Sequence, residues 1–173
     1  MNNYSNIVLF GFMGTGKTRI GSELADKLGM QFVDMDDLVV ERAGKSIPEI
    51  FADEGEAHFR RLERAIVKEL SEQSGFVIAT GGGVIKNADN VRDYGRKGLL
   101  ICLAATPEVI MSRVKDDTNR PLLNTADKLT TIKKLLAERQ PLYDTIPTTV
   151  DTSNLSADEV VDEIMKLFSA PVA

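Results

Sequence analysis

The chain has 173 residues, 43% of them hydrophobic and 27% charged, and a net charge of −5. This length and balance predict one globular domain with a sizeable core, and the negative charge argues against nonspecific binding to nucleic acid or to an anionic membrane, because both need a broad basic surface. No apolar run reaches the roughly 20 residues that cross a bilayer, and the first residues lack the basic and apolar segments of a signal peptide, so we expect a cytoplasmic protein.

Short apolar runs alternate with helical patterns along the chain. The runs lie near 6–10, 31–35, 76–80, 98–103 and 147–151, and the helical patterns near 17–28, 37–43, 47–52, 56–73, 87–95, 106–114, 128–139 and 156–168. This alternation predicts an α/β fold in which helices cover both faces of a parallel sheet. Ligands of such sheets bind at the carboxyl ends of the strands, so we expect the functional residues just after each apolar run.

The first apolar run leads directly into Gly11-Phe-Met-Gly-Thr-Gly-Lys-Thr18, a complete G-x-x-x-x-G-K-[ST] phosphate loop. In this strand-loop-helix context, backbone N–H groups and the positive end of the next helix surround a phosphate. Lys17 is expected to reach the β- and γ-phosphates, and the Thr18 hydroxyl to ligate Mg²⁺. The loop therefore predicts binding of a nucleoside triphosphate, through Gly14, Thr15, Gly16, Lys17 and Thr18.

The second run ends in Phe32-Val-Asp-Met-Asp-Asp37. If the strand persists, Asp34 and Asp36 share one side of it, near the phosphate site. One of them could then hold a metal-bound water and the other a substrate hydroxyl. The alternative is that either residue caps the next helix, although Asp37 is the better candidate for capping or for facing solvent.

The helical pattern at 56–73 places two neighbouring arginines on opposite flanks. At about 100° per residue, Arg60 and Glu63 share one flank, and Arg61 lies on the other. Glu63 could orient Arg60 through an i,i+3 pair and leave its guanidinium free to bind a carboxylate; a solvated charged face is the alternative. His58, the one histidine, is predicted to lie on the surface or to pack rather than to catalyse.

The third run leads into Gly81-Gly-Gly83, where many phosphate-loop enzymes carry a Mg²⁺-binding aspartate. Glycines supply no carboxylate, but they allow the backbone to approach a ligand closely. The metal-side role therefore falls to Asp34, acting through a water. In the fourth run the single cysteine, Cys102, is predicted to be buried and to take part in neither a disulfide nor a metal site.

The polar, proline-containing segment 115–127 between two helical patterns is typical of a lid. Arg120 in this segment could close over the transferring phosphoryl group. Arg113, one turn earlier, could stack on adenine or lie on the surface. Arg139 is predicted to end a helix before Gln140-Pro141, where a cation would favour the helix dipole.

Together and in this order, GFMGTGKT, DMDD, FADEGEAHFRRLE, TGGG, NRPLL and ERQPLYD resemble the shikimate kinases over essentially the whole chain. The resemblance implies a three-layer α/β/α P-loop fold with a five-stranded parallel sheet of order 2-3-1-4-5 and a mobile lid. It implies a single domain over 1–173, with a substrate-binding region at about 34–63 and the lid at about 115–127. The implied reaction transfers the γ-phosphate of ATP, with Mg²⁺, to the 3-hydroxyl of shikimate on the route to chorismate.

The resemblance also implies a role for each matching residue. Asp36 would bind the ring hydroxyls and orient or deprotonate the attacking one, with Lys17 and Arg120 as the other catalytic residues. The implied substrate-binding residues are Asp36, Arg60, Gly81, Gly82, Gly83 and Arg139. The implied nucleotide-binding residues are Gly14, Thr15, Gly16, Lys17, Thr18, Arg113 and Arg120, and the Mg²⁺-side residues are Thr18 and Asp34, the latter through water.

Other functions stay open from the sequence. A gluconate kinase of the same fold would share the phosphate loop and the lid arginine, and a nucleoside monophosphate kinase is disfavoured because nothing resembles a base-reading pocket. A noncatalytic nucleotide-binding module is disfavoured because every catalytic-type position is filled. The expected partner is a small-molecule substrate, without nucleic acid or membrane, and the expected state is a monomer.

Overall fold

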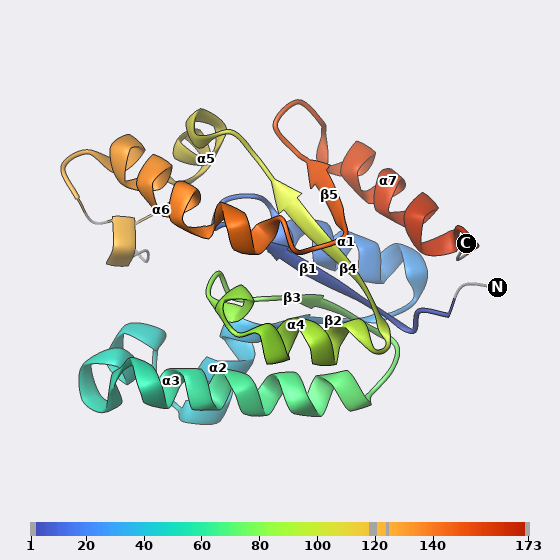
Figure 1. The fold of residues 1–173 in the computed structure, drawn as a ribbon, viewed down its shortest axis with the longest axis horizontal. Coiled ribbons are helices and arrows are strands. Elements are labelled where there is room, and N and C mark those ends of the chain that lie inside the picture. Colours follow the sequence, from blue (N-terminus) through green and yellow to red (C-terminus); the bar gives the residue numbers. More distant parts are fainter. Residues whose placement is uncertain (1–2, 118–120, 124, 172–173) are drawn as a thin grey trace.

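The structure is a computed structural model that describes residues 3–117, 121–123 and 125–171. Its five strands form one parallel sheet in the order β2-β3-β1-β4-β5 (Figure 1), which confirms the predicted class and strand order. The strands are β1 (Asn6–Gly11), β2 (Gln31–Asp34), β3 (Phe76–Ala79), β4 (Gly98–Ala104) and β5 (Thr148–Asp151).

The helices cover both faces of the sheet. They are α1 (Lys17–Leu28), α2 (Met35–Ala43), α3 (Ile47–Glu72), α4 (Ala88–Gly95), α5 (Pro107–Val114), α6 (Lys128–Tyr143) and α7 (Ala157–Ser169), with short 3₁₀ helices η1 (Val84–Lys86) and η2 (Pro121–Leu123). Side chains of the central strand alternate between two apolar clusters: Val8 and Phe10 pack on the side of α3, α4 and α6, and Ile7 and Leu9 on the side of α1 and α7.

The largest departures from the predicted element boundaries are in α3 and α6. The helices expected at 47–52 and 56–73 form the single element α3, whose two parts meet at a kink where Gly55 adopts φ 84° and ψ 168°. The helix expected to end at Arg139 continues through Pro141 to Tyr143. Within the described ranges, no helix has the length and apolar character needed to cross a membrane.

Candidate active site

The phosphate loop joins β1 to α1 and is held by its own carbonyl groups. The Lys17 ammonium donates to the carbonyl oxygens of Gly11 at 2.6 Å and Phe12 at 3.1 Å, and the Thr15 hydroxyl donates to Phe12 at 2.7 Å. Gly14 has a positive φ of 78°, and a Cβ there would lie 2.8 Å from Val114 Cγ1, so the turn requires glycine. The loop thus brings the N-terminus of α1 and the cation of Lys17 to one place, as an anion site requires.

Asp34 closes the other side of the phosphate loop. Its Oδ2 accepts a hydrogen bond from Thr18 Oγ1 at 2.7 Å, and its Oδ1 accepts from the backbone N–H groups of Asp36 at 3.0 Å and Asp37 at 3.3 Å. Asp34 is therefore the N-cap of α2 and Asp37 is not. Asp37 is exposed to solvent, the other of the two places predicted for it. The strand also ends at Asp34 rather than persisting to Asp36, because this cap starts the helix at Met35.

Each glycine of the segment Gly81–Gly83 lies next to a different side chain that is predicted to bind the substrate. A Cβ added to Gly81 would lie 2.7 Å from Asp36 Oδ1, and one added to Gly82 would lie 3.1 Å from a guanidinium nitrogen of Arg139. A Cβ added to Gly83 would collide with the guanidinium of Arg60. Side chains from α2, α6 and α3 thus converge on three successive glycines, where a Cβ would displace each of them from its present position.

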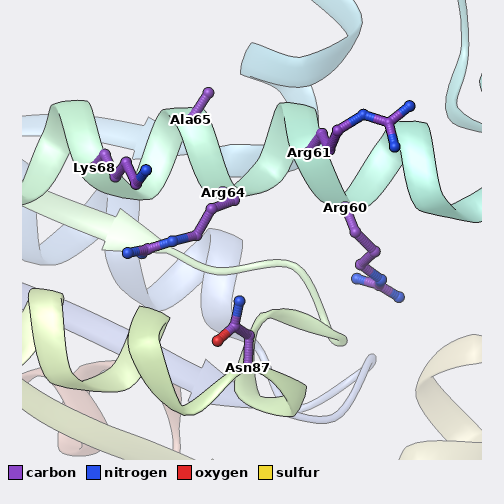
Figure 2. A pocket seen from close by; sticks show the side chains of 6 residues that line it. All are labelled: Arg60, Arg61, Arg64, Ala65, Lys68 and Asn87. Carbon is purple, nitrogen blue, oxygen red and sulfur yellow. The ribbon is translucent and has the colours of Figure 1, made fainter.

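Arg60 is oriented as its helical spacing predicts. Its guanidinium donates to Glu63 at 2.9 Å and lies 5.1 Å from the centroid of the Phe59 ring. The side chain of Glu63 is 4% exposed; burial raises the pKa of its carboxyl, an effect that Arg60 opposes and Asp36 reinforces. In Figure 2 Arg60 extends from the flank of α3 that faces Asn87, whereas Arg61 points away, which confirms the predicted opposite flanks.

Arg139 reaches the glycine segment from the interior of α6. It is 7% exposed, donates to the Gly82 carbonyl oxygen at 3.2 Å and lies 5.5 Å from the centroid of the Phe12 ring. The alternative in which Arg139 is a helix-terminal cation is wrong, because α6 continues for another turn. His58, by contrast, lies at the surface and contacts Glu54 at 3.2 Å, which agrees with its predicted noncatalytic role.

Arg113 links the phosphate loop to the segment after β5. Its guanidinium donates to the Gly14 carbonyl oxygen, to the Thr152 hydroxyl and to the Thr152 carbonyl oxygen, each at 3.1 Å. Thr152 is 3% exposed and its hydroxyl also lies 3.3 Å from the Thr15 carbonyl oxygen. Thr152 is a supporting residue that was not predicted, although it directly follows the end of β5 at Asp151, where functional residues are expected.

The lid segment is described in part. Arg120 lies outside the described residues, as do its two preceding neighbours and residue 124. The two ends of the segment lie together, since the Lys128 ammonium donates to the Lys115 carbonyl oxygen at 2.9 Å. Within η2, Leu123 is buried and Leu122 is 53% exposed.

The remaining polar side chains of the described residues form no preassembled metal centre. In the described part of the chain, no three histidine, cysteine or acidic residues group in a way that could hold a metal ion. Cys102 is 3% exposed, and burial raises the pKa of its thiol to about 11, so it packs in the core as predicted. The hydroxyl of Thr18 and the carboxylate of Asp34 are oxygen donors that the structure brings together beside the phosphate loop.

Comparisons with known proteins point to one family. A model of the family described as shikimate kinase matches residues 13–169. The shikimate kinase of Thermodesulfovibrio yellowstonii is 44% identical over 93% of this chain and 93% of its own length, and that of Pelotomaculum thermopropionicum is 46% identical over 92% and 93%.

Solved structures give the same result. The shikimate kinase from Acinetobacter baumannii in complex with shikimate has a TM-score of 0.89 and 36% identity, covering 96% of this chain and 93% of its own. A gluconokinase from Sinorhizobium meliloti has a TM-score of 0.63 at 16% identity, covering 98% and 94%, and therefore shares the fold alone.

Proposed function

Because the chain belongs to the shikimate kinase family, we propose that Asp36, Arg60 and Arg139 bind the acceptor of its reaction around Gly81–Gly83. The chain is a kinase that phosphorylates shikimate at the 3-hydroxyl with ATP. The observation that carries the assignment is the convergence of these three side chains on three successive glycines.

The proposed acceptor site matches the chemistry of shikimate, a small ring with one carboxylate and three hydroxyls. Two guanidinium groups, from Arg60 and Arg139, supply the planar donors that suit a carboxylate. The Asp36 carboxylate accepts hydrogen bonds from ring hydroxyls, and it orients or deprotonates the attacking one. Glu63 holds one nitrogen of Arg60 at 2.9 Å, and Glu56 contacts the other terminal nitrogen at 3.4 Å. Because Glu56 is 59% exposed, that contact can give way to the carboxylate of the ligand.

On the nucleotide side, the backbone N–H groups of Gly14, Thr15 and Gly16 bind phosphate oxygens and Lys17 reaches the β- and γ-phosphates. Arg113 holds the phosphate loop through its hydrogen bond to the Gly14 carbonyl oxygen, and its guanidinium contacts the adenine of the bound nucleotide. Lys17 and Arg120 stabilise the negative charge of the transferring group. Closure of the lid at about 115–127 excludes water, which protects ATP from hydrolysis.

Mg²⁺ fits the oxygen donors near the N-terminus of α1. The Thr18 hydroxyl would bind the ion directly and Asp34 would hold one of its waters, a donor set of hard oxygens that leaves places for phosphate and water. When bound, the ion supplies positive charge to the phosphate oxygens. The contact between Thr18 and Asp34 keeps both oxygens in place before the nucleotide arrives.

The test is ADP release from Mg²⁺-ATP by the purified protein with shikimate, gluconate, AMP or no acceptor. We expect turnover with shikimate and not with the others. Turnover with gluconate or AMP instead would overturn the roles of Asp36, Arg60 and Arg139. ATP binding without turnover on any acceptor would favour a noncatalytic module.

We further propose that residues 1–173 act as one domain, with the acceptor bound by about 34–63 together with the glycine segment and Arg139. A monomer in the cytoplasm is the proposed state. Sedimentation of the purified protein at several concentrations tests the monomer, because a mass that rises with concentration would contradict it.

A further inference from the structure

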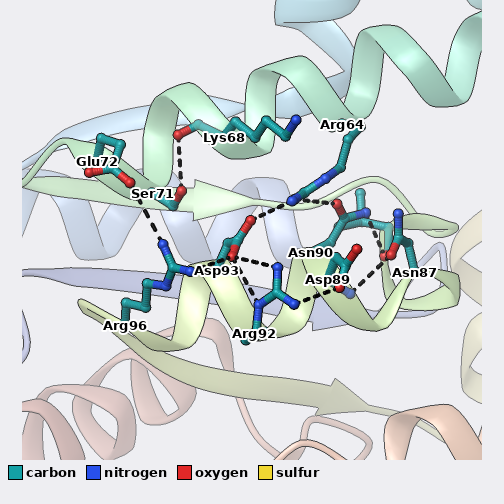
Figure 3. A network of polar contacts seen from close by, with 11 residues as sticks. Arg64, Lys68, Ser71, Glu72, Asn87, Asp89, Asn90, Arg92, Asp93 and Arg96 are labelled. Atoms are coloured by element: carbon teal, nitrogen blue, oxygen red, sulfur yellow. Dashed lines mark hydrogen bonds and ion pairs between the residues drawn. The ribbon is translucent and has the colours of Figure 1, made fainter.

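A buried polar network joins α3 to α4 one turn beyond Arg60 (Figure 3). The guanidinium of Arg64 forks between two side chains of α4, donating to Asn90 Oδ1 at 3.1 Å and to Asp93 Oδ2 at 2.5 Å. Asn90 is 2% exposed and Asp93 is 5% exposed. Buried polar groups with this degree of pairing fix the relative position of the elements that carry them.

The network continues from Asn90 to the glycine segment. The Asn90 side-chain amide donates to the Val84 carbonyl oxygen at 3.1 Å, and Val84 begins η1 immediately after Gly83. The backbone N–H of Val84 in turn donates to the Gly81 carbonyl oxygen at 3.1 Å. Asn90 therefore connects α3 to the backbone on which the proposed acceptor site is built.

The chemistry of Asn90 suits this bridging position. Arg64 has only donors, so the Asn90 oxygen must face it, and the amide nitrogen is left to face the Val84 carbonyl. Asp93 takes the other arm of the fork and also contacts Arg92 at 3.2 Å and Arg96 at 3.4 Å. The hydrogen bond from Arg64 lowers the pKa of the Asp93 carboxyl, which keeps that carboxylate ionised beside the guanidinium.

The network lies next to Arg60 and the glycine segment, so it can affect the geometry of the proposed acceptor site. Arg60 and Arg64 extend from the same flank of α3 (Figure 2), and the guanidinium of Arg60 lies against the Gly83 backbone. The other described hydrogen bonds of the glycine segment do not reach α3: Gly82 accepts from Arg139 in α6, and Gly83 accepts from the backbone N–H of Lys86 in η1. The preceding residue, Thr80, donates to the Leu9 carbonyl oxygen in β1. Within the described residues, Asn90 is thus the hydrogen-bonding side chain that links Arg64 of α3 to the backbone after Gly83.

We propose that Arg64 and Asn90 form a positioning pair, which holds the glycine segment against α3 at the separation that Arg60 needs to bind the carboxylate of the acceptor. This inference rests on the proposed function, in which Arg60 binds that carboxylate. The pair touches neither substrate nor nucleotide. Its effect belongs to acceptor binding, and we expect nucleotide binding at the phosphate loop, which joins β1 to α1, to be unchanged.

The test variant is Asn90→Asp, which keeps an acceptor for Arg64 but replaces the donor to Val84 with a carboxylate oxygen. We expect the KM for shikimate to rise about tenfold, as for loss of one hydrogen bond that orders a site, while the KM for ATP stays unchanged. The matched control is Arg92→Gln, which removes an exposed contact with Asp93 and leaves Arg64 and Asn90 in place. It is expected to keep the wild-type KM for both substrates.

Thermal melts of each variant show whether it is folded. If Asn90→Asp does not fold, Arg64→Lys is the second variant that tests the positioning pair. A lysine keeps the charge beside Asp93 but has no planar fork for Asn90, so it should also raise the KM for shikimate alone. A folded variant with wild-type shikimate KM, or with a parallel rise in the KM for ATP, overturns the proposal. Arg60→Lys runs in parallel: if it leaves the shikimate KM unchanged, the proposed role of Arg60 fails; if only Asn90→Asp is silent, the positioning pair alone fails.

Discussion

At the scale of single residues, Arg60 and Arg61 form a natural matched pair. They are adjacent in sequence and carry the same charge, but only Arg60 faces the glycine segment. We expect Arg60→Lys to raise the KM for shikimate by about tenfold or more, because a lysine cannot bind a carboxylate with two parallel hydrogen bonds. Arg61→Lys should leave the KM unchanged. Steady-state kinetics at saturating ATP measure both, and equal effects would contradict the assignment.

Arg120 tests the chemical step rather than binding. If its contact with the transferring phosphoryl group forms mainly in the transition state, Arg120→Ala lowers kcat by about 100-fold or more and changes the KM for shikimate far less. Rates at saturating concentrations of both substrates give kcat directly. The reverse pattern, a raised KM with kcat retained, would relegate Arg120 to ground-state binding.

Some residue roles could be predicted because their partners are local. The pair between Arg60 and Glu63 follows from a spacing of three residues on one helix. Arg64 and Asn90 are 26 residues apart, and their contact depends on how α3 packs against α4, which no local pattern specifies. The capping role of Asp34 was open from sequence, because three aspartates in a four-residue stretch compete for one helix start.

At the scale of elements, the glycine segment is where an added side-chain carbon should most affect acceptor binding. Gly83 has φ −99° and ψ −1°, which any residue can adopt, so Gly83→Ala should perturb only what its Cβ meets, the guanidinium of Arg60. That guanidinium is the flexible end of a side chain and can move aside. We therefore expect a raised KM for shikimate with little change in melting temperature.

The control for this substitution is Gly95→Ala in α4, where a Cβ would meet Leu100 at an ordinary contact distance of 3.5 Å. Both variants are examined by kinetics and by thermal melts. A Gly83→Ala protein with wild-type shikimate KM would show that Arg60 does not depend on the bare backbone at this position.

The elements themselves follow closely from the sequence. The alternation of apolar runs and helical patterns predicted all five strands and the layers, since each buried parallel strand is a continuous apolar run. The strand order came from the family resemblance, because apolar patterning does not say which strands are neighbours. The end of α6 was misplaced, because Pro141 lies inside the helix, where proline usually signals termination.

At the scale of the whole molecule, Asp93 links stability to pH. Its pKa is lowered below the ordinary 3.8, first by the hydrogen bond from Arg64, so its contribution is fully present above that value and is lost as the pH falls through the folded-state pKa. Between about pH 5 and pH 2, the free energy of unfolding should therefore fall less steeply in Asp93→Asn than in the wild type.

Urea unfolding at a series of pH values measures this slope. Asp89→Asn is the matched control, because Asp89 pairs with the same Arg92 in an exposed ion pair, and such pairs contribute little to stability. Identical slopes for wild type and Asp93→Asn would show that other carboxylates carry the acid sensitivity.

The central place of β1 in the sheet has a consequence for biosynthesis. On one edge of β1, Ile7 pairs with Val77, and on the other edge Asn6 pairs with Gly98. Neither edge can therefore pair until about 70 to 90 further residues have been synthesised. At translation rates of about 5–20 residues per second, the apolar segment leaves the ribosome and stays without its partners for a time on the order of seconds. Such a segment is open to wrong pairings and to capture by chaperones. The same strand order that places the phosphate loop at the middle of the finished enzyme thus delays its completion until most of the polypeptide has been made.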